Sequence, residues 1–235
     1  MTRYGFVLAG GKGMRLRPYT QVLPKPLIPL GDETIVERVL RSLHDVGLRK
    51  VVVSVGYLGY LIESVLGNGE RFGLEIAYTH EDTPLGTAGA LGLIPHTVAP
   101  DDTVLVINGD TLTTLDFGAL LDWFESTGAD AALACAEREI VIDYGVVTAG
   151  ENGRLERIDE KPTTTNLLST GINVFRGSAL RLLPEGRVEM PDFLQSLSRS
   201  GHEVLCHVTD ELWMDLGRVE DLAEANRMLA EGDLR

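Results

Sequence analysis

Short apolar segments alternate with amphipathic segments along most of the 235-residue chain. Segments 4–10, 50–57 and 102–110 consist largely of Val, Ile, Leu and Ala, which is typical of buried strands. Segments 34–46 and 117–127 place apolar residues three or four positions apart, as one buried helix face requires. The alternation predicts an α/β fold in which helices cover a sheet, and we find no linker that would divide it.

The pattern changes after a strand that we expect at 129–137. Residues 144–162 predict a hairpin that turns at Asn152-Gly153, followed by a loop. Further strands are expected at 169–177 and 202–210. The predicted fold is therefore a single Rossmann-like, doubly wound mixed sheet flanked by helices, with an inserted hairpin.

Charge and cysteine content exclude several classes of protein. The formal net charge of −14 disfavours binding to nucleic acid or to anionic membranes, because both are bound mainly through clustered Lys and Arg. Cys135 and Cys206 are far apart, no CxxC pair occurs, and a zinc site is not supported. No apolar run is long enough to span a membrane or to form a signal peptide, so we expect a reduced, cytoplasmic protein.

A glycine-rich, basic loop follows the first predicted strand, in the stretch "LAGGKGMRLRPYTQVLPKPLIPLG" at 8–31. Glycine lets backbone N–H groups approach a phosphate closely, although a glycine-rich loop can also be only a tight turn. Arg15 and Lys25 favour an anionic ligand, and the prolines that flank Lys25 restrict its backbone. The loop contains neither GxxxxGK[ST] nor GxGxxG, so it matches neither a P-loop nor a Rossmann dinucleotide site.

The longer stretch "AGGKGMRLRPYTQVLPKPLIPLGDETIVE" resembles the signature of the sugar-1-phosphate nucleotidylyltransferases. Similar motifs recur along the chain: "PLGTAGAL" (84–91), "NGD" (108–110), "YGVV" (144–147), "EKP" (160–162), "STGINVF" (169–175) and "LWMDLGRVEDLAEAN" (212–226). The resemblance implies an enzyme that joins a nucleoside triphosphate and a sugar-1-phosphate to give an NDP-sugar and pyrophosphate. It implies a nucleotide-binding part at about 1–110, a sugar-phosphate-binding part at about 111–235, and no appended C-terminal β-helix domain.

The same resemblance assigns roles to individual residues. It implies nucleotide binding by Ala9, Gly10, Gly11, Gly13, Arg15, Glu81, Gly86 and Thr87, sugar-phosphate binding by Asn108, Gly145, Glu160, Lys161 and Gly171, and catalytic roles for Arg15, Lys25, Asp110 and Asp215.

Asp110 and Asp215 are the expected ligands of the metal, which we predict to be Mg²⁺. Mg²⁺ usually takes one or two carboxylates and completes its octahedron with water and phosphate oxygens. Considered alone, Asp110 could equally be a turn residue after a strand. Likewise, Lys161 alone could be a solvated loop lysine.

The base and the sugar are less well defined. We favour GTP with mannose- or heptose-1-phosphate, because Glu81 could accept both donors of the guanine edge. The alternatives are a dTTP- or UTP-using, glucose-1-phosphate-type enzyme, or a non-catalytic relative that binds nucleotide-sugars and regulates a partner. A glycosyltransferase of related architecture would instead show a DxD-like motif. A homodimer is compatible with an exposed apolar helix face, but the pattern does not decide the oligomeric state.

Overall fold

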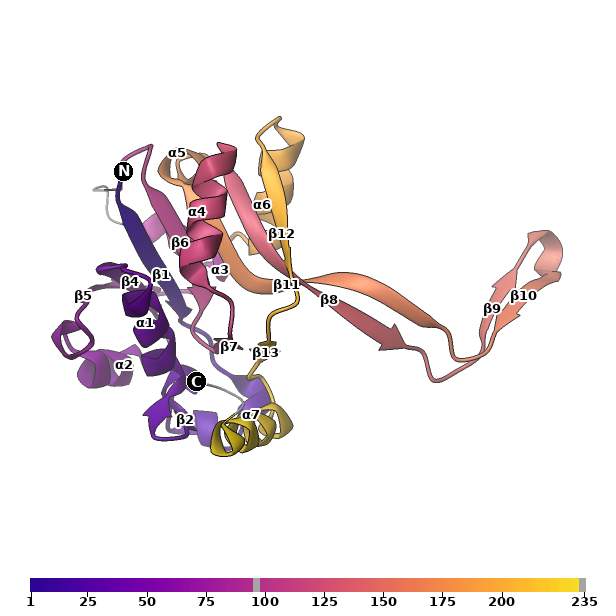
Figure 1. The fold of residues 1–235 in the computed structure, drawn as a ribbon, viewed down its shortest axis with the longest axis horizontal. Helices are drawn as coiled ribbons and strands as arrows, with labels where there is room; N and C mark the ends of the chain where they lie inside the picture. Colours follow the sequence, from indigo (N-terminus) through magenta and orange to yellow (C-terminus); the bar gives the residue numbers. More distant parts are fainter. Residues whose placement is uncertain (95–97, 233–235) are drawn as a thin grey trace.

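The computed structural model describes residues 1–94 and 98–232. Figure 1 shows a body built around a central sheet and a long two-stranded arm that projects from it. In spatial order, the seven-stranded sheet contains β12 (Val204–Thr209), β8 (Ala131–Val141), β11 (Thr163–Arg176), β6 (Thr103–Asn108), β1 (Arg3–Ala9), β4 (Lys50–Val55) and β5 (Glu75–His80). Strands β6, β1, β4 and β5 are parallel, whereas β11 is antiparallel to both β6 and β8. The predicted mixed, doubly wound α/β sheet is confirmed.

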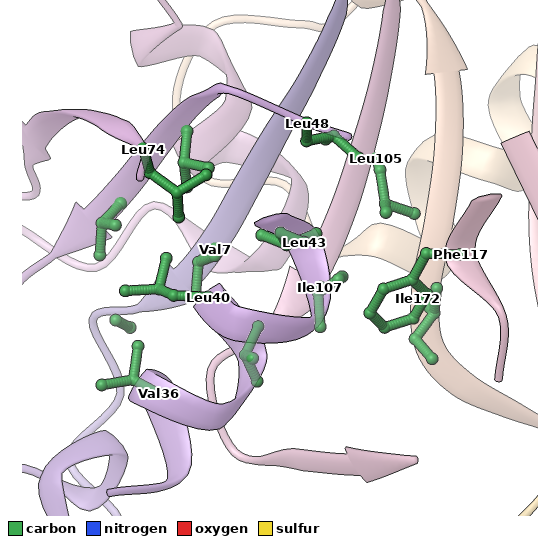
Figure 2. Close-up of a cluster of buried hydrophobic side chains, with 14 of the residues drawn as sticks. Val7, Val36, Leu40, Leu43, Leu48, Leu74, Leu105, Ile107, Phe117 and Ile172 are labelled. Carbon is green, nitrogen blue, oxygen red and sulfur yellow. The ribbon is translucent and has the colours of Figure 1, made fainter. Parts of the chain in front are cut away.

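Helices cover both faces of the sheet, as the alternating pattern predicts. They are α1 (Ile35–Asp45), α2 (Gly59–Leu66), α3 (Gly86–Gly89), α4 (Phe117–Thr127), α5 (Gly177–Leu180), α6 (Met190–Arg199) and α7 (Val219–Glu231). Side chains of α1, α2 and α4 pack on one face around Val7 and Ile107 (Figure 2). Side chains of α3, α5 and α6 pack on the other face around Phe6 and Val106. Neighbouring residues of one strand thus enter opposite cores, which is why the central strands are apolar throughout.

Three small two-stranded sheets complete the fold. They pair β2 (Pro29–Leu30) with β3 (Glu33–Thr34), β7 (Thr111–Thr113) with β13 (Trp213–Asp215), and β9 (Val146–Ala149) with β10 (Leu155–Asp159). The last helix, α7, packs its Leu222 and Ala225 into a third apolar cluster with Leu30 and Leu112. This cluster ties the C-terminal helix to the segment after the glycine-rich loop. Among the described helices, none is both long and apolar enough to cross a membrane.

The outer halves of β8 and β11 form the arm, which differs from the sequence prediction (Figure 1). We expected a strand ending at residue 137 and a loop before 169, but both strands continue and pair outward as far as Val141 and Thr163. The physical reason is a run of β-branched residues, Thr163–Thr165 opposite Ile140 and Val141, which suits cross-strand pairing. The predicted hairpin is present as β9 and β10, and its turn uses the left-handed Asn152 and Gly153. It lies at the far end of the arm rather than over the sheet.

The two cysteines lie on adjacent strands and are both free thiols, one buried and one exposed. Burial, together with the neighbouring Cys206, raises the pKa of the Cys135 thiol to about 11. At pH 8 only about one in a thousand such thiols is ionised, and the thiolate is the reactive form.

We therefore expect a single fast-reacting thiol in the native protein, that of Cys206. Titration with Ellman's reagent at pH 8 should give one rapid equivalent in buffer and two in guanidinium chloride. Cys206→Ser should remove the rapid equivalent and Cys135→Ser should leave it. A rapid equivalent that survives in Cys206→Ser would contradict the burial of Cys135.

Candidate active site

A cavity of about 400 Å³ opens at the carboxyl ends of β1 and β6. Its wall is formed by residues from six parts of the chain: Leu8, Ala9, Gly10, Gly11, Gly13, Met14, Arg15, Lys25, Pro26, Glu81, Pro84, Gly86, Thr87, Asn108, Asp110, Glu189 and Gly217. From β1 the chain proceeds to β4 on one side, whereas β6 lies on the other side. This arrangement is a topological switch point, where α/β sheets commonly bind ligands.

The glycine-rich loop forms one wall of the cavity. Gly13 has a left-handed φ of 57°, and a Cβ there would lie 2.9 Å from Thr20 Cγ2. The Thr20 hydroxyl donates to the Gly13 carbonyl at 2.8 Å and holds the loop in this shape. Within the described part of the chain, the backbone N–H groups of Gly11, Lys12 and Gly13 donate to no protein acceptor. Three consecutive free donors beside a cavity suit an anionic group such as a phosphate.

Lys25 is the buried cation of the site. It begins a short 3₁₀ turn, Lys25–Leu27, and its side chain is only 8% exposed. The Lys25 Nζ donates to Asp110 Oδ2 and, at 3.2 Å, to Asp215 Oδ1. Two carboxylates that are 105 positions apart in the sequence therefore converge on one ammonium group.

The pairing of β7 with β13 brings these carboxylates together. Asp110 immediately precedes β7, and Asp215 ends β13 opposite Thr111. The Leu216 N–H donates to the Asp110 carbonyl at 3.2 Å, which fixes the two backbones beside each other. Arg15 adds a second cation, and its Nη2 lies 3.4 Å from Asp215 Oδ2.

The Asp110–Asp215 pair is chemically suited to a divalent cation. Both carboxylates already reach one cationic atom, Lys25 Nζ, so they can also reach one metal ion. No cluster of three or more His, Cys, Asp or Glu residues able to hold a metal occurs in the described ranges. Two carboxylates with open positions are what Mg²⁺ uses when phosphate oxygens complete its shell.

Glu81 and Glu189 also line the cavity. The Glu81 carboxylate accepts from Ser54 Oγ at 3.1 Å and from the Leu85 N–H at 3.0 Å. A Cβ on Gly10 would come within 2.6 Å of this carboxylate, so Glu81 packs directly against the glycine-rich loop.

Glu189 is a residue that the sequence analysis missed. Its carboxylate accepts from the N–H and the hydroxyl of Thr87, both at 3.3 Å. Hydrogen bonds from Arg187, and then from the Thr87 N–H, hold the pKa of Glu189 below its usual value. In the sequence, Glu189 stands before a helix whose second residue is Pro191, a pattern that predicts a helix start and gives no signal of a cavity.

The residues expected to bind the sugar phosphate fall into two groups. Asn108 lines the cavity, and Gly171, with a φ of 75°, lies close against the Asn108 amide without lining the cavity itself. Gly145, Glu160 and Lys161 lie instead on the arm, between its ribbon and its terminal hairpin. There Gly145 is next to Glu160, since a Cβ on Gly145 would lie 3.2 Å from Glu160 Oε2. The structure therefore does not bring all the expected residues into one pocket of one chain.

Gly171→Ala should destabilise the protein more than Gly153→Ala does. Both glycines have φ near 75°, which costs an alanine about 1–2 kcal/mol. Only Gly171 faces a close neighbour, because nothing lies within 4 Å of a Cβ on Gly153. We expect the collision with Asn108 to add about 1–3 kcal/mol, measured by urea unfolding. If the two variants lost equal amounts of unfolding free energy, Asn108 would have to move freely away from the new methyl group.

A family model for nucleotidyl transferases matches residues 4–232. The chain belongs to the nucleotidyl transferase family. The matched range includes every cavity residue and both carboxylates, so the site just described lies wholly within it.

Curated relatives cover nearly the whole chain. It is 33% identical to the UTP–glucose-1-phosphate uridylyltransferase of Synechocystis sp. over 97% of this chain and 64% of the relative. It is 31% identical to the mannose-1-phosphate guanylyltransferase of Mycobacterium tuberculosis over 96% of this chain and 64% of the relative. The chain thus spans less than two thirds of the length of these relatives.

A solved structure shares the fold. It is a Bacillus anthracis protein, provisionally named glucose-1-phosphate thymidylyltransferase and bound to sucrose, with a TM-score of 0.79 and 26% identity. The alignment covers 97% of this chain and 95% of that one. The names of these three proteins specify three different bases, so similarity alone does not choose among them.

Proposed function

We propose that the chain joins a nucleoside triphosphate to a sugar-1-phosphate and releases pyrophosphate. The observation that carries the proposal is the convergence of Lys25, Asp110 and Asp215 beside three free backbone donors at the carboxyl edge of the sheet. Residues 1–110 would supply most of the nucleotide-binding part, and 111–235 the sugar-phosphate-binding part.

The chemistry would need positioning and charge stabilisation rather than a covalent enzyme intermediate. A sugar-phosphate oxygen attacks the α-phosphorus of the triphosphate, the new P–O bond forms, and the bond to pyrophosphate breaks in line. The attacking phosphate is already ionised at neutral pH, so no general base is required. The free N–H groups of the loop and Arg15 would hold the departing pyrophosphate, and Lys25 would stabilise charge on the reacting phosphates.

Asp110 and Asp215 would hold Mg²⁺. The ion, when bound, would supply neutralisation of the phosphate charges and a fixed position for their oxygens. The two aspartates would be available to one ion because Asp110 immediately precedes β7 and Asp215 ends the paired strand β13, and both accept from the Lys25 ammonium.

We propose GTP as the preferred nucleoside triphosphate, because the cavity lining suits its guanine base. Two of the carboxylates that line the cavity are those of Glu81 and Glu189, and carboxylates only accept hydrogen bonds. Guanine presents adjacent N1–H and 2-amino donors, whereas uracil and thymine would direct a carbonyl oxygen at a carboxylate. The bonds from Ser54 and Leu85 use one lone pair on each Glu81 oxygen and leave others for a base.

Competition among GTP, dTTP, UTP, ATP and CTP should show a preference for GTP. Glu81→Gln should lower the ratio of kcat/KM for GTP to that for UTP by about 5- to 150-fold, the cost of one unpaired polar group. Asp82→Asn is the matched control, because Asp82 is exposed and adjacent to Glu81 but does not line the cavity. A preference for UTP or dTTP, or an unchanged ratio in Glu81→Gln, would refute this assignment.

The reaction class itself is tested by a substrate matrix. Each triphosphate would be paired with glucose-, mannose- and heptose-1-phosphate, and pyrophosphate release would be measured by a coupled assay. Pyrophosphate release that requires both substrates would support the proposal. No release from any pair, with intact nucleotide binding, would favour a non-catalytic nucleotide-sugar-binding protein.

A further inference from the structure

The arm presents the densest group of exposed apolar side chains in the molecule. Of eighteen large apolar residues that are exposed among those described, eight lie between positions 140 and 167. They are Ile140, Val141, Ile142, Tyr144, Val147, Leu155, Ile158 and Leu167, with 37% to 79% of their surface accessible. Apolar surface of this extent on a projecting element marks an interaction site, because a two-stranded ribbon alone is only marginally stable in water.

The root of the arm is firmly fixed to the body, close to the cavity. The Trp213 indole donates to the Thr170 carbonyl at 2.7 Å, and the Thr170 hydroxyl donates to the Ala134 carbonyl at 2.9 Å. On the other strand of the ribbon, β8, the Arg138 guanidinium donates to the Trp213 carbonyl at 3.0 Å. Gly171 then places the root directly against Asn108, a cavity residue.

The outer end of the arm lies well away from the central sheet of its own chain. Pairing of β8 with β11 runs without a register shift from Thr163 to Ser169, and the single shift lies at the root, between Ser169 and Asn173. Lys161 is eight positions beyond Ser169, which is about 26 Å along an extended strand. Figure 1 shows the ribbon leading away from the sheet over this length.

The lining of the cavity has more acidic than basic side chains, although both of the ligands that we propose are phosphorylated. Its lining includes Glu81, Asp110 and Glu189 against Arg15 and Lys25. Two phosphorylated substrates would add several negative charges, so a further cation is needed there. Lys161 is exposed on the arm, and its left-handed φ of 46° is unusual for a residue with a side chain.

We propose that two copies of this chain exchange arms, so that Glu160 and Lys161 of each copy complete the cavity of the other. The inference rests on the proposed function for the role of Lys161 and on the exposed apolar surface for the contact itself. In a two-fold dimer, each arm leaves from the rim of its own cavity, so the same contact is made twice. Covering eight apolar side chains and the polar ones between them on each copy removes on the order of the 800 Å² per partner that a stable dimer buries.

Subunit mixing tests the exchange through turnover. Asp110→Asn inactivates the cavity and leaves the arm intact, whereas Lys161→Ala inactivates the arm and leaves the cavity intact. Each variant alone should be nearly inactive. The doubly tagged heterodimer should regain about half of the wild-type activity, because one of its two cavities combines an intact lining with an intact arm, and an unselected equal mixture should regain about a quarter. An active wild type whose mixed variants give only the sum of the parents would overturn the exchange, because an arm acting within its own chain cannot complement.

Crosslinking tests the same contact without catalysis. In a Cys135→Ser, Cys206→Ser background, Lys161→Cys on one chain and Met14→Cys on the other should join through a short bismaleimide, since Met14 lines the cavity and is exposed. Leu182→Cys is the matched partner control, because Leu182 is exposed but does not line the cavity. Crosslinking in the Met14 pair alone supports the exchange even if no substrate pair turns over, which would refute only the proposed function.

The oligomeric state separates the remaining outcomes. Light scattering after size-exclusion chromatography should show a wild-type dimer and a monomeric Val147→Ser, Leu155→Ser, Ile158→Ser variant. Val22→Ser with Leu182→Ser removes comparably exposed apolar side chains outside the arm and should remain a dimer. A wild type that is monomeric at micromolar concentration would overturn the proposal. A triple-serine arm variant that remains a dimer would also overturn it, if Lys161→Cys and Met14→Cys fail to crosslink.

Discussion

Asp110→Asn and Asp215→Asn should each lower kcat by roughly 10³-fold or more, the scale expected for losing a metal ligand that stabilises transferring phosphate charge. Asparagine keeps the shape of the side chain but removes its charge. Both carboxylates accept from the same atom, Lys25 Nζ, so both are placed to hold one metal ion, and each variant loses one of its two protein ligands. Steady-state pyrophosphate release at several Mg²⁺ concentrations measures the loss.

The control for this prediction is Asp101→Asn. Asp101 is exposed and does not line the cavity, so the kcat of the Asp101→Asn variant should equal that of the wild type. Calorimetric titration with Mg²⁺ gives a readout apart from activity, and both cavity variants should bind the ion more weakly. Full activity in excess EDTA, or unimpaired turnover in both variants, would show that the carboxylates hold no catalytic metal.

The local patterns of the sequence were sufficient for the elements that surround the site. The capping box of α1 is one example, in which the Thr34 hydroxyl accepts from the Glu37 N–H and the Glu37 carboxylate accepts from the Thr34 N–H. The predicted helix at 34–46 therefore forms as Ile35–Asp45. The strands expected at 4–10 and 102–110 end at Ala9 and Asn108, within two residues of the expected ends, because glycine and polar residues stop each apolar run.

Contacts between distant segments could not be read in the same way. Asp110 and Asp215 were paired by resemblance, whereas their distance depends on the register of β7 with β13, two strands of three residues each. A shift of one residue would turn Asp215 to the opposite face. Nothing in so short a pattern specifies that register, which is set instead by the packing of Leu112 and Leu216 in one apolar cluster.

The arm escaped the sequence analysis for a related reason. The segments of the ribbon around Ile140 and Leu167 are half polar, and alternation of this kind reads as a strand only when a partner strand is known. A two-sided ribbon also buries no single face, so its hydrophobic pattern does not point to a core. Glu160 and Lys161 could thus be assigned to a sugar phosphate by motif, but their distance from the cavity could not be foreseen.

Lys25→Ala should lower kcat by roughly 10²-fold or more, the effect of removing one preorganised charge-stabilising donor. Lys25 is flanked in the chain by Pro24 and Pro26, which restrict its backbone, and its side chain is 8% exposed, so little of its positioning depends on solvent. Arg17→Ala is the matched control, because Arg17 is an exposed cation of the same loop that does not line the cavity. Steady-state kinetics in both substrates should show unchanged turnover for the control.

The same substitution should strengthen binding of Mg²⁺ while it weakens turnover, and this opposite pair of effects identifies the role of Lys25. In the ligand-free protein the Lys25 ammonium neutralises Asp110 and Asp215, so an entering divalent cation has to compete with it. Without the ammonium, the two carboxylates repel each other and the folded state is less stable until a cation binds. We therefore expect Mg²⁺ to raise the Tm of Lys25→Ala by more than it raises the Tm of the wild type. If Lys25 only supported the fold, Mg²⁺ would raise both Tm values equally, and kcat would recover once the variant was saturated with the ion.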